Sequence, residues 1–209
     1  YSAWASITGS YAALADTIEL LDQPLEAELL QPAPAPLLFQ KDIQFKAARF
    51  RYTGDGPWVL DGLNLTITKG ARVGFVGNTG SGKSTTLDLL MGLLMPTEGG
   101  LLVDGQPISG IRGRAWQQTI AHVPQSIYLA DATLAENIAF GVVAANIDLD
   151  RVRQAASQAQ ISDFIESNPE GYQASVGERG IRLSGGQRQR IGIARALYKQ
   201  ASVLVFDEA

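Results

Sequence analysis

The most informative feature of this sequence is a glycine-rich loop at residues 77–85, which reads GNTGSGKST. It contains the spacing G-x-x-x-x-G-K-[ST], whose glycines allow a tight turn and let backbone N–H groups approach an anion. The loop leads into a helix start, where free N–H donors and a partial positive charge favour phosphate. The predicted phosphate-binding residues are Gly77, Asn78, Thr79, Gly80, Ser81, Gly82, Lys83, Ser84 and Thr85.

The two flanks of the loop fit this interpretation. Residues 72–76 (RVGFV) form a short apolar run that predicts a strand. After the loop, Leu87, Leu90, Met91 and Leu94 recur at helical spacing. A strand, a glycine-rich loop and a helix in this order place the Lys83 ammonium at the terminal phosphates of a nucleotide and the Ser84 hydroxyl on Mg²⁺.

Composition excludes several other functions. The 209 residues carry a net charge of −4, which argues against a protein held to nucleic acid by phosphate contacts. The chain has no Cys and a single His, so thiolate metal sites, disulfides and histidine clusters are excluded. No apolar run reaches the roughly 18 residues of a membrane span, and no signal peptide is recognisable.

Both ends of the sequence fall at unusual points. The chain starts at Tyr1 rather than Met, and it stops at Ala209 directly after an apolar run that ends in two acids. Natural domains seldom end inside a buried junction between a strand and a loop. We therefore expect the sequence to be a piece of a longer protein, cut at both ends.

Residues 1–23 predict a helix with one apolar stripe, and residues 24–37 predict a linker. The stripe consists of Trp4, Ile7, Tyr11, Leu14, Ile18 and Leu21. It is compatible with the tail of a longer helix from a preceding domain and with an ordinary amphipathic helix. The linker contains Pro24 and the stiff, extended sequence QPAPAP, so we place a domain boundary there.

From about residue 38 the chain predicts an α/β domain. Alternating apolar residues indicate strands at 43–52 and 63–67, with shorter strands at 99–103 and 119–123. A helical insertion follows at about residues 126–182, where helices are expected at 133–140, 148–160 and 161–167. Thr133 and Asp148 are the expected N-caps, and Glu136 completes a capping box with Thr133.

A second glycine-lined helix start lies at residues 183–187, which read LSGGQ. Ser184 and Gln187 have the spacing of a capping box, and the N–H groups of Gly185 and Gly186 are free to meet an anion. The alternative is a plain capped helix without a ligand.

The final run, VLVFDE, predicts a strand buried on both faces and followed by two acids. In a parallel sheet, ligands bind at the carboxyl ends of strands. Asp207 is therefore expected to support Mg²⁺ and Glu208 to polarise a water molecule. An acidic loop after an ordinary core strand is the alternative.

Taken together, GNTGSGKST, LSGGQRQR and VLVFDEA, in this order and separation, resemble the nucleotide-binding domain of an ABC transporter of the exporter type, over about residues 38–209. The resemblance implies a P-loop NTPase with a parallel core sheet, an antiparallel β subdomain on the N-terminal side, and a helical insertion that carries the LSGGQ signature. It also implies that Tyr52 stacks on adenine and that Gln125 contacts Mg²⁺. Residues 176–180 (VGERG) and 128–141 resemble exporter sequences.

The same resemblance implies a mechanism. Two domains pair head to tail, and each ATP on one phosphate loop is closed by the partner's signature residues, namely Leu183, Ser184, Gly185, Gly186 and Gln187. Hydrolysis, with Glu208 as general base, drives export of an unknown substrate through the transmembrane domain of the same chain, at the cytoplasmic face of a membrane. Residues 1–23 then resemble the end of the last transmembrane helix. No nucleic-acid partner is expected.

The chain also departs from the family pattern. The strand and switch histidine that follow the DEA sequence in the family are absent, and His122 is interpreted as a strand residue. We expect this segment alone to be poorly soluble and to have little ATPase activity. The alternatives are an ATP-dependent association module and a soluble ABC-type ATPase without transport. A GTPase is excluded because no N-K-x-D sequence is present.

Overall fold

The computed structural model describes residues 2–22 and 31–207, which fall into two compact units divided between Ala33 and Pro34. The first unit is helix α1 (Ser2–Leu21), which confirms the predicted helix. Its stripe residues Tyr11, Leu14 and Ile18 are exposed. Among the described residues, no helix has both the length and the apolar character that a membrane span requires. Residues 24–30 of the predicted linker lie outside the described residues.

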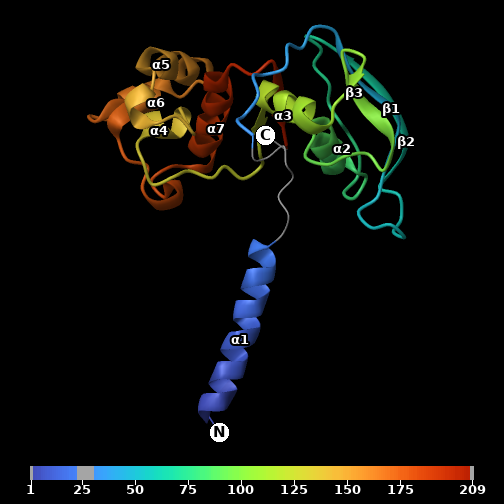
Figure 1. Ribbon diagram of the computed structural model, residues 1–209. Coiled ribbons are helices and arrows are strands. Elements are labelled where there is room, and N and C mark those ends of the chain that lie inside the picture. Colours follow the sequence, from blue (N-terminus) through green and yellow to red (C-terminus); the bar gives the residue numbers. More distant parts are fainter. Residues whose placement is uncertain (1, 23–30, 208–209) are drawn as a thin grey trace. The chain divides into compact units, whose positions relative to one another are not determined.

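An antiparallel sheet opens the second unit. It contains β1 (Asp42–Phe50), β2 (Leu60–Thr68), β3 (Glu98–Val103) and β4 (Gln106–Pro107), in the order β2-β1-β3-β4 (Figure 1). The predicted alternation is confirmed on β1, where Ile43, Phe45, Ala48 and Phe50 are buried. The register of β1 shifts beside Gly99, whose φ is 72°. A Cβ there would lie 2.3 Å from the Ala47 carbonyl oxygen, so this close approach requires glycine.

Two helices pack beneath this sheet. Helix α2 (Lys83–Leu90) follows the phosphate loop as predicted, and α3 (Gly110–Thr119) was not predicted. The centre of their shared core is Trp116, which is fully buried and donates from Nε1 to the Leu90 carbonyl oxygen at 2.8 Å. Its ring meets Phe39 edge to face, with centroids 5.8 Å apart. Trp116 therefore joins α3 to the end of α2.

The parallel part of the fold is a two-stranded sheet of β5 (Ile120–Val123) and β6 (Val203–Phe206). The two strands pair in parallel from Ile120 opposite Val203 to Val123 opposite Phe206. His122 lies in β5 opposite Val205, so its interpretation as a strand residue is confirmed. The carboxyl ends of both strands consequently meet at one edge.

Two strand predictions are wrong in this region. Residues 72–76 form no strand, and Val76 is 99% exposed. In β6, Leu204 and Phe206 are 40% and 45% exposed, so the strand is not buried on both faces. The physical reason is the same for both segments. An apolar run becomes a strand only when a neighbour accepts its backbone hydrogen bonds, and within the described residues 2–22 and 31–207, β6 pairs with β5 alone.

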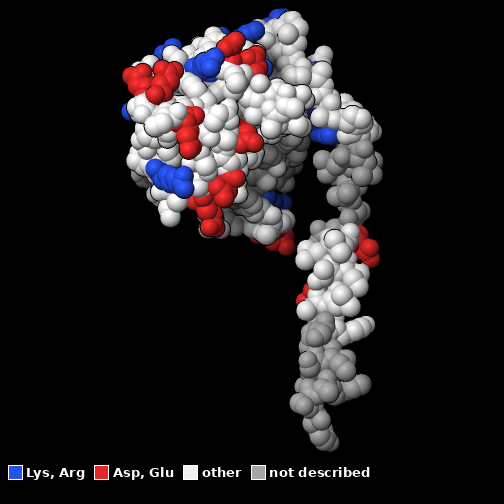
Figure 2. Space-filling model, turned by 90° about the vertical axis from the view of Figure 1, so that its left-hand side faces the viewer, with Lys and Arg blue, Asp and Glu red and all other residues white. Residues whose placement is uncertain are grey.

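A helical region lies between β5 and β6 in the sequence and gathers on one side of this unit (Figure 1). Its elements are α4 (Leu134–Ile138), η2 (Ala144–Asn146), α5 (Leu149–Gln158), α6 (Ser162–Glu166), η3 (Gly171–Gln173), η4 (Glu178–Gly180) and α7 (Gly185–Lys199). The predicted caps are confirmed: Thr133 and Glu136 form a capping box, and the Asp148 carboxylate accepts from two backbone N–H groups. Figure 2 shows this side of the molecule, where acidic and basic side chains are interspersed.

Candidate functional site

The phosphate loop turns into α2 through Gly82. This residue is the N-cap of the helix and has a φ of 83°, a conformation that favours glycine. A Cβ at this position would lie 2.9 Å from Leu60 Cδ2 and 3.1 Å from the Val59 carbonyl oxygen. The first i→i−4 bond of the helix runs from Thr86 N to Gly82 O. The N–H groups of the preceding helix residues are therefore left for a ligand.

Lys83 closes the loop on itself. Its Nζ donates to the carbonyl oxygens of Gly77 and Asn78, at 2.8 and 2.9 Å. Residues 77–81 around it are exposed, and the side chain of Ser84 is also exposed at the start of α2. The ammonium group thus lies against the first two residues of the loop. An anion at this point would meet both a cation and backbone donors.

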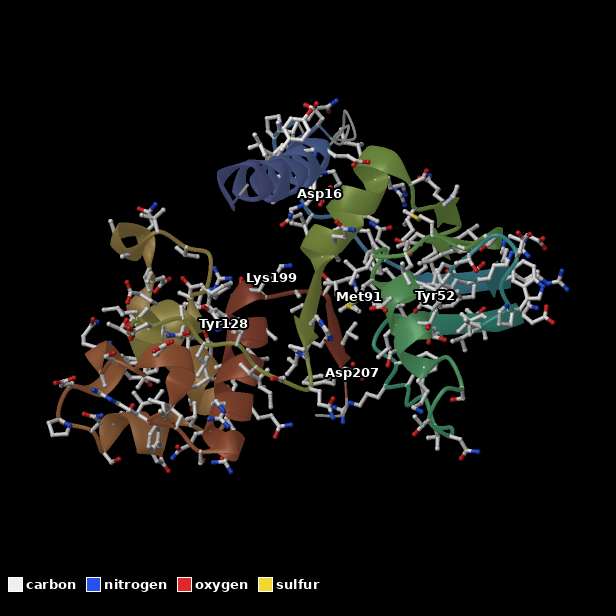
Figure 3. The ribbon with its side chains drawn as sticks, turned by 90° about the horizontal axis from the view of Figure 1, so that it is seen from below. Asp16, Tyr52, Met91, Tyr128, Lys199 and Asp207 are labelled. Atoms are coloured by element: carbon white, nitrogen blue, oxygen red, sulfur yellow. The ribbon has the colours of Figure 1, made fainter. Side chains whose placement is uncertain are left out.

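Tyr52 reaches the same helix start from the end of β1. The residue is 64% exposed, and its hydroxyl lies 3.1 Å from Oγ1 of Thr85, the third residue of α2. The Tyr52 ring also contacts Phe50 edge to face, with centroids 4.9 Å apart. The structure thus places an exposed aromatic ring beside the predicted phosphate loop, and Figure 3 labels it next to the antiparallel sheet.

Gln125 and Asp207 come from the neighbouring ends of β5 and β6. Asp207 N donates to the Val123 carbonyl oxygen at 3.1 Å, which continues the strand pairing by one residue. Gln125 follows β5 by two residues, so both predicted ligands leave the carboxyl edge of the parallel sheet, where Figure 3 labels Asp207. Ser84 belongs to α2 instead, and the meeting of all three residues at one Mg²⁺ stays a prediction.

Two further observations concern the predicted metal and base. In the part of the chain that the structure describes, no three His, Cys, Asp or Glu side chains gather at one point to hold a metal ion. The predicted set of Ser84, Gln125 and Asp207 contains only one such residue, and Mg²⁺ commonly takes one or two carboxylates together with substrate phosphates. Glu208, the predicted base, lies outside the described residues.

The signature residues form an exposed helix start. Ser184 is the N-cap of α7: its Oγ accepts from Gln187 N at 3.2 Å, and Gln187 Oε1 accepts from Ser184 N at 2.8 Å. This confirms the predicted capping box. Leu183 is buried and anchors the start of the helix, whereas Gly185 and Gly186 are exposed and have open space around them. The local geometry leaves room for an anion or a partner surface.

A Ser184→Ala variant tests the capping box. We expect the substitution to lower the free energy of unfolding by about 1 kcal/mol, because it removes the oxygen that accepts from the Gln187 N–H. Urea denaturation followed by circular dichroism measures this loss. Ser184→Thr keeps an oxygen acceptor and should recover most of the stability. Equal stability of the alanine variant and the parent chain would contradict the assigned cap.

Sequence reasoning missed the contact that fastens α7 to α4. Arg195 Nε donates to the Asn137 carbonyl oxygen at 3.0 Å, and the guanidinium lies 4.3 Å from the centroid of the Phe140 ring. Burial lowers the pKa of Arg195. The Asn137 side chain is itself fully buried and hydrogen-bonds to Ala130 and Thr133. The sequence offered no signal beyond an amide inside an apolar helix, because the partners are 58 positions apart.

The two glycine-lined helix starts lie in different parts of the unit. Helix α2 lies beneath the antiparallel sheet, whereas α7 belongs to the helical region (Figure 1). Each start by itself has room for an anion. Helix α2 leads into β3 of the antiparallel sheet, whereas α7 leads into β6 of the parallel sheet.

Comparison with known proteins places this arrangement in a family. The ABC transporter family model matches residues 60–209. The chain is 40% identical over 205 residues to the ATP-dependent lipid A-core flippase of Chromohalobacter salexigens, covering 98% of this chain and 35% of that protein. It is 43% identical over 170 residues to the alpha-hemolysin translocation ATP-binding protein HlyB of Escherichia coli O157:H7, covering 81% and 24%. The chain thus spans about a third or less of the length of these relatives.

A solved structure supports the same assignment. The structure of a bacterial Atm1-family ABC exporter with ATP bound matches with a TM-score of 0.81 and 36% identity, over 98% of this chain and 35% of that one. The similarity extends over the antiparallel sheet, the phosphate loop and the helical region, since nearly the whole chain is covered. The chain therefore belongs to the ABC transporter family.

Proposed function

We propose that the chain binds ATP at the 77–85 loop and hydrolyses it to power export across a membrane. The observation that carries the proposal is the pair of glycine-lined helix starts, at α2 and at α7. The first has a lysine inside its loop, and the second has an exposed serine and two exposed glycines. A nucleotide that bridges two copies of the domain, head to tail, would use both.

The roles of the residues follow from their chemistry. The Lys83 ammonium and the free N–H groups of α2 bind the phosphates, and the exposed Tyr52 ring offers a face to the base. Ser184, Gly185 and Gly186 of the partner domain close the other side. Closure excludes water from the phosphates and strengthens the charged contacts that hold them.

Mg²⁺ suits the oxygen donors that this chain offers. Ser84 would supply a hydroxyl, Gln125 an amide oxygen and Asp207 a carboxylate, which are the ligands that this ion takes in proteins. When bound, the ion would neutralise charge on the phosphates. Glu208 would orient the attacking water and accept its proton.

The assignment to export rests on the relatives. The matched proteins include lipid A-core flippases, an alpha-hemolysin translocation protein and a heavy metal exporter. Because these cargoes differ chemically, the proposal names none. The chain covers about a third of its relatives, so we propose a transmembrane domain in the same polypeptide, with residues 1–23 at its junction and the ATPase unit at the cytoplasmic face.

A Lys83→Met variant tests the nucleotide site. Methionine keeps an unbranched apolar stem but removes the ammonium, so we expect ATP in the presence of Mg²⁺ to bind about 10- to 100-fold more weakly, as for the loss of a hydrogen bond to a charged group. Isothermal titration calorimetry with the purified chain measures the dissociation constant.

The matched control is Lys69→Met. Lys69 also donates to a backbone carbonyl, that of Phe39, but it lies at the end of β2 outside the loop. This variant should bind ATP within about twofold of the parent chain, as expected for a lysine that makes no ligand contact. Failure of the parent chain to bind ATP, or an equal loss in both variants, would contradict the proposed site.

A further inference from the structure

Two consecutive threonines at the start of α2 use their hydroxyls differently. Thr86 Oγ1 donates to the Gly82 carbonyl oxygen four residues earlier, at 2.8 Å, which is the common local contact of a helical threonine. Thr85 is also buried, with 7% of its surface exposed, but its Oγ1 lies 3.1 Å from the Tyr52 hydroxyl, 33 positions away in the sequence. Of these two threonines, Thr85 is the one whose hydroxyl contacts a residue outside α2 and its N-cap.

Two contacts hold the exposed Tyr52 ring in place. Phe50, a buried core residue of β1, meets the Tyr52 ring edge to face at one end. The Thr85 hydroxyl holds the phenol oxygen at the other end. A threonine side chain on a helix has few accessible rotamers, so its oxygen is a stiff anchor. Tyr52 as a whole is 64% exposed and therefore keeps surface free for a ligand.

The anchor lies where the phosphates are proposed to bind. Thr85 belongs to the first turn of α2, before the first helical i→i−4 bond, and Lys83 is two residues earlier. The hydrogen bond between the Tyr52 and Thr85 hydroxyls thus sets the position of the ring relative to the phosphate-binding groups. A ligand that contacts both the ring and the phosphate-binding groups must match the separation between them.

We infer that Thr85, through its hydroxyl bond to Tyr52, is a positioning residue that presets the Tyr52 ring for a nucleotide base. The inference rests on the proposed ATP site and goes beyond the stacking expected from the ring alone. A preset ring loses less conformational freedom on binding, so a ligand with a base gains affinity. A ligand that consists only of phosphates gains nothing from the ring.

The test compares ATP with inorganic tripolyphosphate, each in the presence of Mg²⁺, by calorimetry on the whole chain. Tyr52→Phe keeps the ring and removes only the hydroxyl. We expect it to weaken ATP binding about 3- to 10-fold, the size of one neutral hydrogen bond. Tripolyphosphate binding should change by less than about twofold, because the phosphate-binding groups are untouched.

A double-mutant cycle shows whether Thr85 is the anchor. In a Thr85→Ala background, the further change Tyr52→Phe should not weaken ATP binding, because the hydrogen bond is already absent. In a Thr86→Ala background, which removes the neighbouring hydroxyl and leaves the anchor, the full effect of Tyr52→Phe should remain. Thr85→Ser keeps a hydroxyl and should preserve the coupling to Tyr52.

The outcomes separate the inference from the proposed function. If the parent chain bound neither ATP nor tripolyphosphate, both the inference and the proposed function would be overturned. If the parent chain binds both ligands, three results overturn the inference alone: unchanged ATP affinity in Tyr52→Phe, an equal loss for tripolyphosphate, or an undiminished Tyr52→Phe effect in the Thr85→Ala background.

Discussion

Replacement of Glu208 by glutamine is expected to slow ATP hydrolysis about 10²–10⁴-fold, the contribution of a general base, and to leave ATP binding intact. Glutamine has nearly the same size and keeps one oxygen, but it cannot accept a proton from the attacking water. Glu208 follows Asp207 in the sequence, and Asp207 lies at the edge where β5 and β6 end. A single-turnover assay with γ-labelled ATP detects hydrolysis even where steady turnover is slow.

The matched control is Glu98→Gln. Glu98 forms an exposed ion pair with Arg49 on the antiparallel sheet, and its loss should leave both hydrolysis and binding unchanged. Calorimetry on the same samples gives the affinity for ATP. If Glu208→Gln lowered binding and hydrolysis by the same factor, the residue would hold the nucleotide rather than act as its base.

Replacement of Trp116 by alanine is expected to lower the free energy of unfolding by about 3–5 kcal/mol, as for other buried large-to-small substitutions. The change leaves a cavity beneath the antiparallel sheet and removes the donor to the Leu90 carbonyl oxygen. Because Leu90 ends α2, the helix that follows the phosphate loop loses a contact with α3. Urea unfolding followed by circular dichroism measures the loss.

Trp58→Ala is the control for this substitution. Trp58 is only partly buried, and its ring contacts the guanidinium groups of Arg49 and Arg51, at 5.6 and 4.5 Å from the centroid. Its loss should cost about 1 kcal/mol or less, the typical strength of an exposed cation–π contact. Similar losses in the two variants would contradict the central place given to Trp116.

The parts of the fold that sequence predicted well depend on local interactions. The capping boxes at Thr133 and Ser184 join residues three positions apart, so their spacing is visible in the sequence. The alternation of apolar residues along β1 likewise indicates which face of the strand is buried. The phosphate loop was recognisable because its glycines and its lysine act within one turn of chain.

The parts that sequence did not predict depend on distant partners. Helix α3 contains two glycines and little apolar periodicity, and Trp116 holds it in place by packing on Phe39 and Leu90. Residues 72–76 have the apolar pattern of a strand, but pattern alone supplies no hydrogen-bonding neighbour. The contact between Tyr52 and Thr85 could not be read from spacing, because it joins residues 33 positions apart.

The contacts of Lys83 have a consequence for how the loop behaves between nucleotides. Its ammonium group already donates to Gly77 and Asn78, so the arrival of a phosphate exchanges hydrogen-bond partners instead of satisfying an isolated cation. These two hydrogen bonds hold the start of the loop to its lysine and satisfy two donors of the ammonium group. We expect the loop to return to this conformation each time a nucleotide dissociates.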